Sequence, residues 1–474
     1  MCLRFGFQIP FFTKRKQSAE RWAALFCNKL SGLEPSGVRK RAGGTFSPRG
    51  GPPAGGLAAV GRENLVPGQL VCYHGQRKKN RGVTLLHAEE RFWEIYGREP
   101  EGVAFAPYRV CPIGAHSDHN LGKITGFAID RGIRLAYGAK LNGVVELCSL
   151  QFPKRAQWFV QSVPPRQGDW ADYLRGAVWA LEKRRPLSVG LCGVLEGTLP
   201  IGGLSSSAAV TIAFLTALCR VNRIRLSPEE LIETALDAEK NYVGVQVGSL
   251  DQSCEVLSQK DKLLYLDTKS GSWECIPAGP AMPPWEIMIF FSGLEHSLKG
   301  SLYNARVDEL KAGVYALRAF AGMESRPFAE SVARDVPREV FETYKSRLPE
   351  SWALRCEHWY GEFQRVEAGA EAWRRGDLAE YGRLCFESGW SSIHNWQPGA
   401  PEQITLYEIM RQTPGIYGGR FSGAGFKGCC MALIDPACAE DIAEKVTRDY
   451  LAAYPRLEGQ YGVYRCHSAD GVKL

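Results

Sequence analysis

Three segments of this 474-residue chain combine residue types that could do chemistry, and the stretch 197–209 is the most informative. Two adjacent glycines, Gly202 and Gly203, precede three serines at 205–207. Glycines let backbone amides approach an anion closely, and the N-terminus of a helix favours negative charge. The pattern therefore fits a phosphate-binding loop, although it lacks the Gly-Lys-Ser/Thr of a Walker A motif. A serine-capped helix after a glycine-rich turn fits it equally well.

The other two segments are 107–120 and 421–428. The first is unusually polar, and its His116, Asp118 and His119 are of the types that ligate metals. No further cluster of His or Cys completes such a site, so metal binding by this trio is disfavoured. The second segment is rich in glycine and lies between apolar strands, so by itself it predicts a tight β-turn.

Strands and helices must position these segments, and the apolar periodicity predicts both from about Val83 onward. A Ser-Pro-Glu-Glu capping box at 227–230 marks one helix start. Strands are predicted at 102–106, 144–150, 285–291 and 429–434, and helices at 85–96, 170–181, 205–220, 227–240, 302–321, 355–375, 378–390, 402–412 and 437–453. This order predicts an α/β lobe followed by an α+β lobe, with a boundary near 270–285.

Residues 1–82 differ from the rest of the chain in charge and composition. They hold 15 basic and three acidic residues, a net charge of +12, whereas the remainder carries −5. Glycine, proline and positive charge without apolar periodicity predict disorder, because too little apolar surface can be buried. A transit peptide, an upstream extension of the reading frame and a tail that touches nucleic acid are the alternatives. The acidic body argues against a uniformly basic nucleic-acid-binding protein.

The overall composition, 45% hydrophobic and 23% charged, is typical of a globular enzyme. No apolar run approaches the roughly 20 residues that a membrane-spanning helix needs. The 15 cysteines are scattered and include no CxxC pair. This usage favours reduced thiols in the cytoplasm, and neighbouring Cys429 and Cys430 are predicted to be buried core thiols.

Taken together and in order, segments 107–120, 203–209 and 421–430 resemble three motifs of the GHMP family of small-molecule kinases, in its sugar 1-kinase branch. Residues 238–252 are similar to the family segment that carries the catalytic aspartate. The resemblance begins near Val83, and it implies an α+β, two-lobed GHMP kinase fold. It implies an N-terminal lobe at 83–275, like domain 2 of ribosomal protein S5, and a ferredoxin-like C-terminal lobe at 276–474. A disordered extension, 1–82, precedes both.

The resemblance also implies transfer of the ATP γ-phosphoryl group to the anomeric hydroxyl of a sugar. Asp251 would accept the hydroxyl proton, and Arg109 would stabilise the developing charge. Ser207 and Glu239 would bind Mg²⁺, which prefers oxygen ligands. The implied sugar-binding residues are His116, Asp118 and Tyr303. The implied ATP-binding residues are Gly202, Gly203, Leu204, Ser205, Ser206, Ser207, Ala208, Gly423 and Gly425. Two departures from the family pattern are a shortened 200–204 stretch and Lys427 in place of glycine.

Within the family the sequence most resembles galacturonokinases, and Ala115 gives this a physical meaning. Galactokinases have a glutamate there, near the C6 hydroxyl of the sugar, whereas galacturonate carries a carboxylate at C6. Two carboxylates about 4 Å apart repel by roughly 4 kcal/mol at an effective dielectric constant near 20. The predicted substrate is therefore galacturonate, with galactose as the alternative and a non-catalytic sugar sensor as a remote one. We expect a cytoplasmic enzyme without nucleic-acid or membrane partners, for which a monomer is reasonable.

Overall fold

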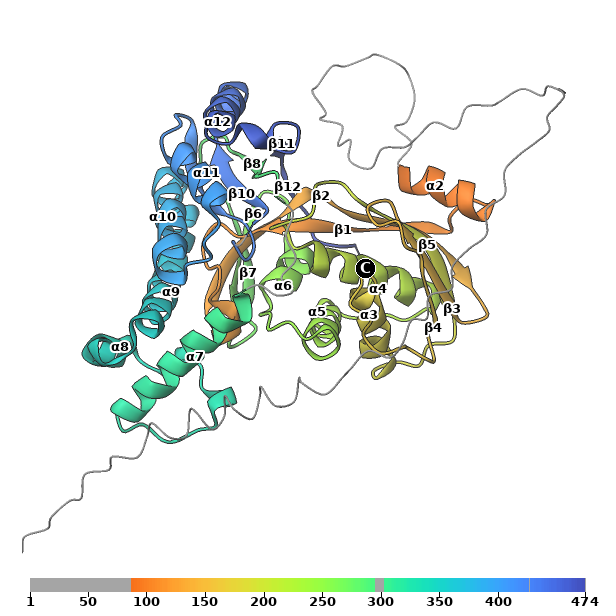
Figure 1. Ribbon diagram of the computed structural model, residues 1–474, viewed down its shortest axis with the longest axis horizontal. Coiled ribbons are helices and arrows are strands. Elements are labelled where there is room, and N and C mark those ends of the chain that lie inside the picture. Colours follow the sequence, from red (N-terminus) through yellow and green to blue (C-terminus); the bar gives the residue numbers. More distant parts are fainter. Residues whose placement is uncertain (1–86, 295–301, 426, 474) are drawn as a thin grey trace, which may run out of the picture. The chain divides into compact units, whose positions relative to one another are not determined.

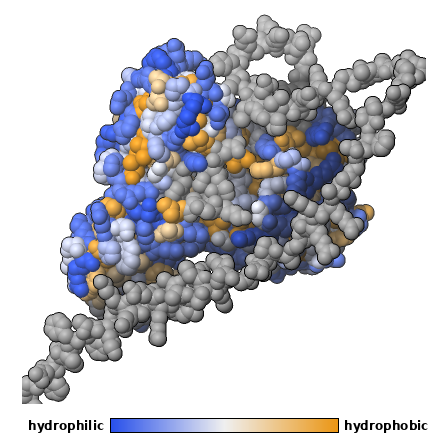
Figure 2. Space-filling view, viewed as in Figure 1, coloured by the Kyte–Doolittle hydropathy of each residue, from blue (hydrophilic) through white to orange (hydrophobic). Residues whose placement is uncertain are grey.

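The computed structural model describes residues 87–294, 302–425 and 427–473. All of them belong to one unit, Gly68–Leu474, and the predicted disordered extension at 1–82 lies outside them. None of the helices in these three ranges is long and apolar enough to cross a membrane. Hydrophilic and apolar residues are mixed over the face shown in Figure 2.

The first sheet is organised around one long strand, β2 (Lys123–Lys140), which the sequence did not predict. β2 pairs in antiparallel fashion with β1 (Gly102–Val110), β5 (Gly190–Gly197) and β6 (Lys262–Asp267). The outer strands are β3 (Val144–Ser149), β4 (Ala156–Phe159) and β7 (Trp273–Pro277). At Gly132, β2 passes so close to β1 that a Cβ would lie 2.1 Å from the carbonyl oxygen of Ala106. Glycines at such contacts interrupt the apolar alternation by which a strand is recognised.

Helices cover one face of this sheet (Figure 1). They are α3 (Asp172–Glu182), α4 (Ser206–Val221), α5 (Pro228–Asp237) and α6 (Leu250–Leu257), while α2 (His87–Tyr96) packs beside β5. The predicted capping box is confirmed, because the Ser227 side chain accepts a hydrogen bond from the backbone N–H of Glu230. α5 continues into a π-helical turn, η2 (Ala238–Val243).

The second sheet has four antiparallel strands in the order β11 (Gly462–Cys466), β8 (Glu286–Phe291), β10 (Cys429–Ile434) and β9 (Ile416–Phe421). The predicted strand at 429–434 is confirmed as β10, and both of its cysteines, Cys429 and Cys430, are buried. The helices of this half are α7 (Tyr303–Phe320), α8 (Arg338–Tyr344), α9 (Glu350–Arg375), α10 (Leu378–Ser391), α11 (Pro401–Arg411) and α12 (Ala439–Ala453). The predicted two-lobed α+β fold is thus present.

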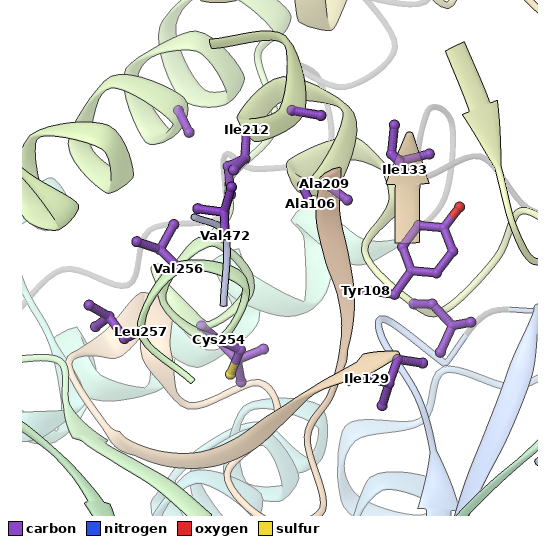
Figure 3. Close-up of a cluster of buried hydrophobic side chains, with 14 of the residues drawn as sticks. Ala106, Tyr108, Ile129, Ile133, Ala209, Ile212, Cys254, Val256, Leu257 and Val472 are labelled. Atoms are coloured by element: carbon purple, nitrogen blue, oxygen red, sulfur yellow. The ribbon is translucent and has the colours of Figure 1, made fainter. Parts of the chain in front are cut away.

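The two halves share one core, although the chain changes sheets between β7 and β8. Trp373 of α9 packs against Phe127 of β2, with ring centroids 5.3 Å apart. The end of the chain also returns to the first sheet, where β12 (Ser468–Ala469) pairs with β2. Figure 3 shows Val472 beside Ile212 of α4 and Val256 of α6. The predicted lobe boundary at 275/276 stays a prediction, and the last residues lie on the first half rather than the second.

Candidate active site

A cavity of about 950 Å³ collects most of the residues to which the sequence assigned chemistry. Its walls come from the end of β1, the loop at 115–118, the start of α4, the segment 243–251 and the start of α7. The glycine-rich turn at 423–427 lines the same space. Three segments that are far apart in sequence therefore meet at one site.

Arg109 and Asp251 form an ion pair in the wall of this cavity. The guanidinium Nε of Arg109, on β1, donates to Oδ1 of Asp251, on α6, over 2.7 Å. The other carboxylate oxygen, Oδ2, accepts a hydrogen bond of 2.8 Å from the Ser205 hydroxyl. Arg109 also donates from Nη1 to the carbonyl oxygen of Gly203 over 3.0 Å. The carboxylate is thus held between two donors while 26% of its side chain stays exposed.

The start of α4 has the features of an anion-binding site. Ser205 occupies the N-cap position with a left-handed backbone (φ 64°), yet its side chain makes no capping hydrogen bond. Its hydroxyl is used by Asp251 instead, so the first-turn amides of α4 have no side-chain acceptor from this cap. A helix start with free amides and positive partial charge is suited to phosphate.

The two glycine-rich loops pack directly on each other. A Cβ on Gly203 would lie 2.7 Å from the carbonyl oxygen of Ser422, and one on Gly423 would lie 2.8 Å from the Cα of Gly203. Both glycines have positive φ, +84° and +71°. Only glycine permits this approach without displacement, so the second loop has a structural function beyond a tight turn. Lys427 lines the cavity from the same loop.

Another part of the cavity wall, the sugar wall, contains the predicted sugar-binding residues His116, Asp118 and Tyr303. Asp118 accepts a hydrogen bond of 3.0 Å from the backbone N–H of Leu250, next to Asp251. Burial raises the pKa of Asp118 and lowers that of His116 well below its usual value. His116 stacks on Trp396, with ring centroids 4.8 Å apart, and it has a left-handed backbone (φ 64°). Ala115 and Tyr303 line the cavity beside them.

Glu239, predicted to bind Mg²⁺, is buried on the π-helical turn η2 and is not among the residues that line the cavity. Its Oε1 accepts a hydrogen bond of 2.7 Å from Nε2 of Gln252. Burial and the nearby charge of Asp251 raise the pKa of Glu239 to about 8, although hydrogen bonds from Gln252 and Ser207 lower it in part. A bound cation would favour the ionised form of this carboxyl group, and with the Ser207 hydroxyl it would supply the oxygen ligands that Mg²⁺ prefers.

The structure does not bring every predicted residue into the cavity wall. Gly202, Gly203, Ser205, Ser206, Ser207 and Gly423 line it, together with Arg109, Asp251, His116, Asp118 and Tyr303. Leu204 and Ala208 are instead buried in the core. A Cβ on Gly425 would meet the Phe421 ring at 2.9 Å, so this glycine shapes the loop. The functional assignments of all these residues stay predictions.

Sequence reasoning missed the residues of α9 that hold the loop at 114–118, the sugar-side loop. Nε2 of His358 lies 3.0 Å from the carbonyl oxygen of Ala115, and Nε1 of Trp359 donates to the carbonyl oxygen of Ser117 over 3.0 Å. Glu362 accepts a hydrogen bond from the backbone N–H of Gly114. The available signal was a polar pair, His358 and Glu362, four positions apart on a helix face that also carries Trp359.

The chain is similar in sequence to known proteins. Residues 90–139 match the galactokinase galactose-binding signature, 172–259 the GHMP kinases N terminal domain, and 370–452 the GHMP kinases C terminal domain. The chain is 37% identical over 397 residues to a galacturonokinase of Arabidopsis thaliana, covering 78% of this chain and 93% of that protein. It is 31% identical over 385 residues to a galactokinase of Roseiflexus sp. (strain RS-1), covering 81% and 95%.

Solved structures show the same fold. The structure of Lactococcus lactis galactokinase complexed with galactose superposes with a TM-score of 0.74 at 24% identity, covering 81% of this chain and 98% of that one. Methanococcus jannaschii mevalonate kinase superposes with a TM-score of 0.54 at 14% identity, covering 78% and 98%.

Proposed function

Because this chain belongs to the GHMP kinase family and is a sugar 1-kinase within it, we propose that its sugar is galacturonate. The reaction would convert galacturonate and ATP into galacturonate 1-phosphate and ADP. The observation that carries the choice of sugar is Ala115, which lines the cavity beside His116 and Asp118. A methyl group there leaves room for the C6 carboxylate and places no negative charge beside it.

Asp251 is the proposed general base. Its carboxylate is oriented by Arg109 and Ser205, and it faces the cavity between the sugar wall and the start of α4. In this position it can accept the proton of the anomeric hydroxyl as the oxygen attacks the γ-phosphorus. A positioned base of this kind contributes about 10²–10⁴-fold to the rate.

Arg109 is the proposed stabiliser of the charge that develops during transfer. Its side chain is 96% buried, and burial alone would lower its pKa, but the adjacent Asp251 outweighs this and raises it. The group therefore keeps its proton and its positive charge beside the reacting oxygen. The amides of the glycine-rich loops and of the α4 N-terminus would bind the phosphates, so that positioning and electrostatics account for catalysis.

Ser207 and Glu239 are the proposed Mg²⁺ ligands. Ser207 lines the cavity and interacts with the carboxyl group of the buried Glu239, and both side chains offer the oxygen ligands that Mg²⁺ prefers. Bound there, the ion would supply positive charge to the phosphates of ATP. We also propose that the enzyme works in the cytoplasm, because the cysteines in the described ranges are free thiols.

Galactose is the second candidate substrate. Residues 90–139 match the galactokinase galactose-binding signature, and the Roseiflexus relative is a galactokinase. An ADP-release assay with galacturonate, glucuronate and galactose side by side decides between the candidates. We expect galacturonate to exceed galactose in kcat/KM by at least about tenfold, or roughly 1.4 kcal/mol. A preference for galactose would refute the argument from Ala115.

A further inference from the structure

A buried ionic cluster lies behind the sugar-side loop, outside the cavity. At its centre is Glu362 of α9, whose side chain has no exposed surface. Its Oε1 accepts a hydrogen bond of 2.6 Å from the backbone N–H of Gly114, the residue before Ala115. A carboxylate from one half of the molecule thus holds the backbone of a loop from the other half.

Two arginines form ion pairs with this carboxylate. Arg365 donates from Nε to Oε2 over 2.8 Å, and the fully buried Arg420 approaches Oε1 with Nη1 at 3.3 Å. The Ser388 hydroxyl donates to Oε1 over 2.5 Å and accepts a hydrogen bond from Arg420. Burial alone would raise the pKa of Glu362, but Arg365, His358 and Arg420 hold it at about 2. The group is therefore ionised throughout the neutral range.

Arg420 links the cluster to the glycine-rich turn at 422–428, which is proposed to bind phosphate. It is the penultimate residue of β9, two positions before the glycine-rich turn at 422–428, and its Nη2 donates to the Ser392 hydroxyl over 2.8 Å. Its Nε donates to the carbonyl oxygen of Phe421 over 3.0 Å. The same turn packs on Gly203. Through Arg420, Glu362 therefore connects the sugar-side loop with the glycine-rich turn at 422–428.

The same turn of α9 makes two more contacts with the sugar-side loop. His358 Nε2 faces the carbonyl oxygen of Ala115, which can only accept, so Nε2 carries the hydrogen and Nδ1 accepts from the Ser391 hydroxyl. Trp359 donates to the carbonyl oxygen of Ser117. Between these two fixed carbonyls lies His116 with its left-handed backbone. Such a conformation persists only where surrounding contacts impose it.

We propose that Glu362 is a positioning residue for phosphoryl transfer: it fixes the sugar-side loop in its binding conformation and connects that loop to the glycine-rich turn at 422–428. The proposal rests on the proposed function, in which this loop binds the sugar. Loss of the charge of Glu362 leaves two arginines without their carboxylate and weakens the hydrogen bond from the N–H of Gly114. The sugar site is then disordered more than the ATP site, because the ATP loops are also held by glycine-to-glycine packing.

The test is the pair of KM values in Glu362→Gln, measured with the sugar that the wild-type enzyme prefers. We expect the KM for sugar to rise at least tenfold while the KM for ATP changes less than threefold. Glu371→Gln is the matched control, because Glu371 lies on the same helix but is 61% exposed and pairs only with Arg374 in the described structure. The control should match wild type in both KM values. A general loss of folding would not separate the two substrates in this way.

Trp359→Phe is a second test variant, and it leaves the buried charges in place. It removes the N–H that reaches the carbonyl oxygen of Ser117 and also shortens a buried aromatic side chain, so the melting temperature should fall. The KM for sugar should rise about threefold to tenfold while the KM for ATP stays close to wild type. If Glu362→Gln does not fold, the KM values of Trp359→Phe for sugar and for ATP test the proposal in its place. Unchanged sugar KM values, or equal rises in both KM values, would overturn the proposal. A wild-type preference for galactose refutes only the substrate proposed above, whereas inactivity toward every sugar refutes both.

Discussion

The phosphate wall and the sugar wall of the cavity are built by different means. The phosphate wall consists of backbone: two glycine-rich loops that touch each other and the first turn of α4. The sugar wall consists of side chains on a short loop whose backbone is held by α9. Backbone amides present the same chemistry whichever residues flank them, whereas side chains can be exchanged one at a time. The phosphate wall is therefore suited to the cosubstrate common to a kinase family, and the sugar wall to a substrate that varies.

Asp251 belongs to neither wall, and its substitution should have the largest effect. In Asp251→Asn, kcat should fall by about 10²–10⁴-fold, because the amide cannot accept the proton of the anomeric hydroxyl. Affinity for ATP, measured by titration without sugar, should change little. A fall in kcat of less than tenfold would show that another group is the base.

Gly203→Ala should damage the phosphate wall selectively. The new Cβ would lie 2.7 Å from the carbonyl oxygen of Ser422 at a φ of +84°, so the two loops must separate. We expect kcat/KM for ATP to fall about a hundredfold, or roughly 2.7 kcal/mol, with the KM for sugar little changed.

Gly322→Ala is the control for backbone strain in this experiment. Gly322 also has a positive φ, +63°, but nothing lies within 4 Å of its Cβ position. This variant should lose about 1–2 kcal/mol of stability without any change in kinetics. Equal kinetic losses in both variants would contradict a specific function of the loop contact.

Ala115→Glu should alter the sugar wall alone. The added carboxylate would face the C6 carboxylate of galacturonate, and it offers an acceptor to the C6 hydroxyl of galactose. The ratio of kcat/KM for galacturonate over galactose should fall at least about tenfold, while the KM for ATP stays the same. Ala115→Ser adds a hydroxyl without charge, and it should leave the ratio within about threefold of wild type. A similar fall in the serine variant would point to crowding rather than to charge.

The last expected effect is on stability rather than on kinetics, a pH dependence that originates at His358 behind the sugar wall. Burial lowers the pKa of His358 from its usual 6.5 to about 4. Below pH 6.5 the unfolded chain therefore binds a proton that the folded protein does not, so the free energy of unfolding falls as the pH falls from 6.5 towards 4. The loss is about 1.4 kcal/mol per pH unit for one histidine.

His358→Gln isolates this contribution, because glutamine does not titrate and can still donate a hydrogen bond. Denaturant unfolding between pH 7 and pH 4.5 should give a shallower decline for the variant than for the wild-type protein. Parallel curves would mean that His358 titrates normally in the folded state.

Sequence alone identified the elements and residues whose signals are local. The adjacent Gly202 and Gly203, the capping box at Ser227 and the apolar strand at 429–434 are each recognisable within a few residues, and the structure has a tight loop contact, a helix start and a strand at these places. The four ordered motifs also led to the family. β2 was missed because Gly132 and similar close contacts interrupt its apolar alternation.

Only the tertiary structure decided how the sugar wall is held. Glu362 is 248 positions from Gly114, and Asp251 is 142 from Arg109, so neither contact leaves a local pattern. The return of Val472 to α6 is equally long-range. Glycine conformations and helix caps are settled by interactions within one turn of chain, and sequence therefore reports them directly. Buried polar contacts between distant segments are selected by the packing of the whole core, because a polar group removed from water must find whichever partner the fold brings to it.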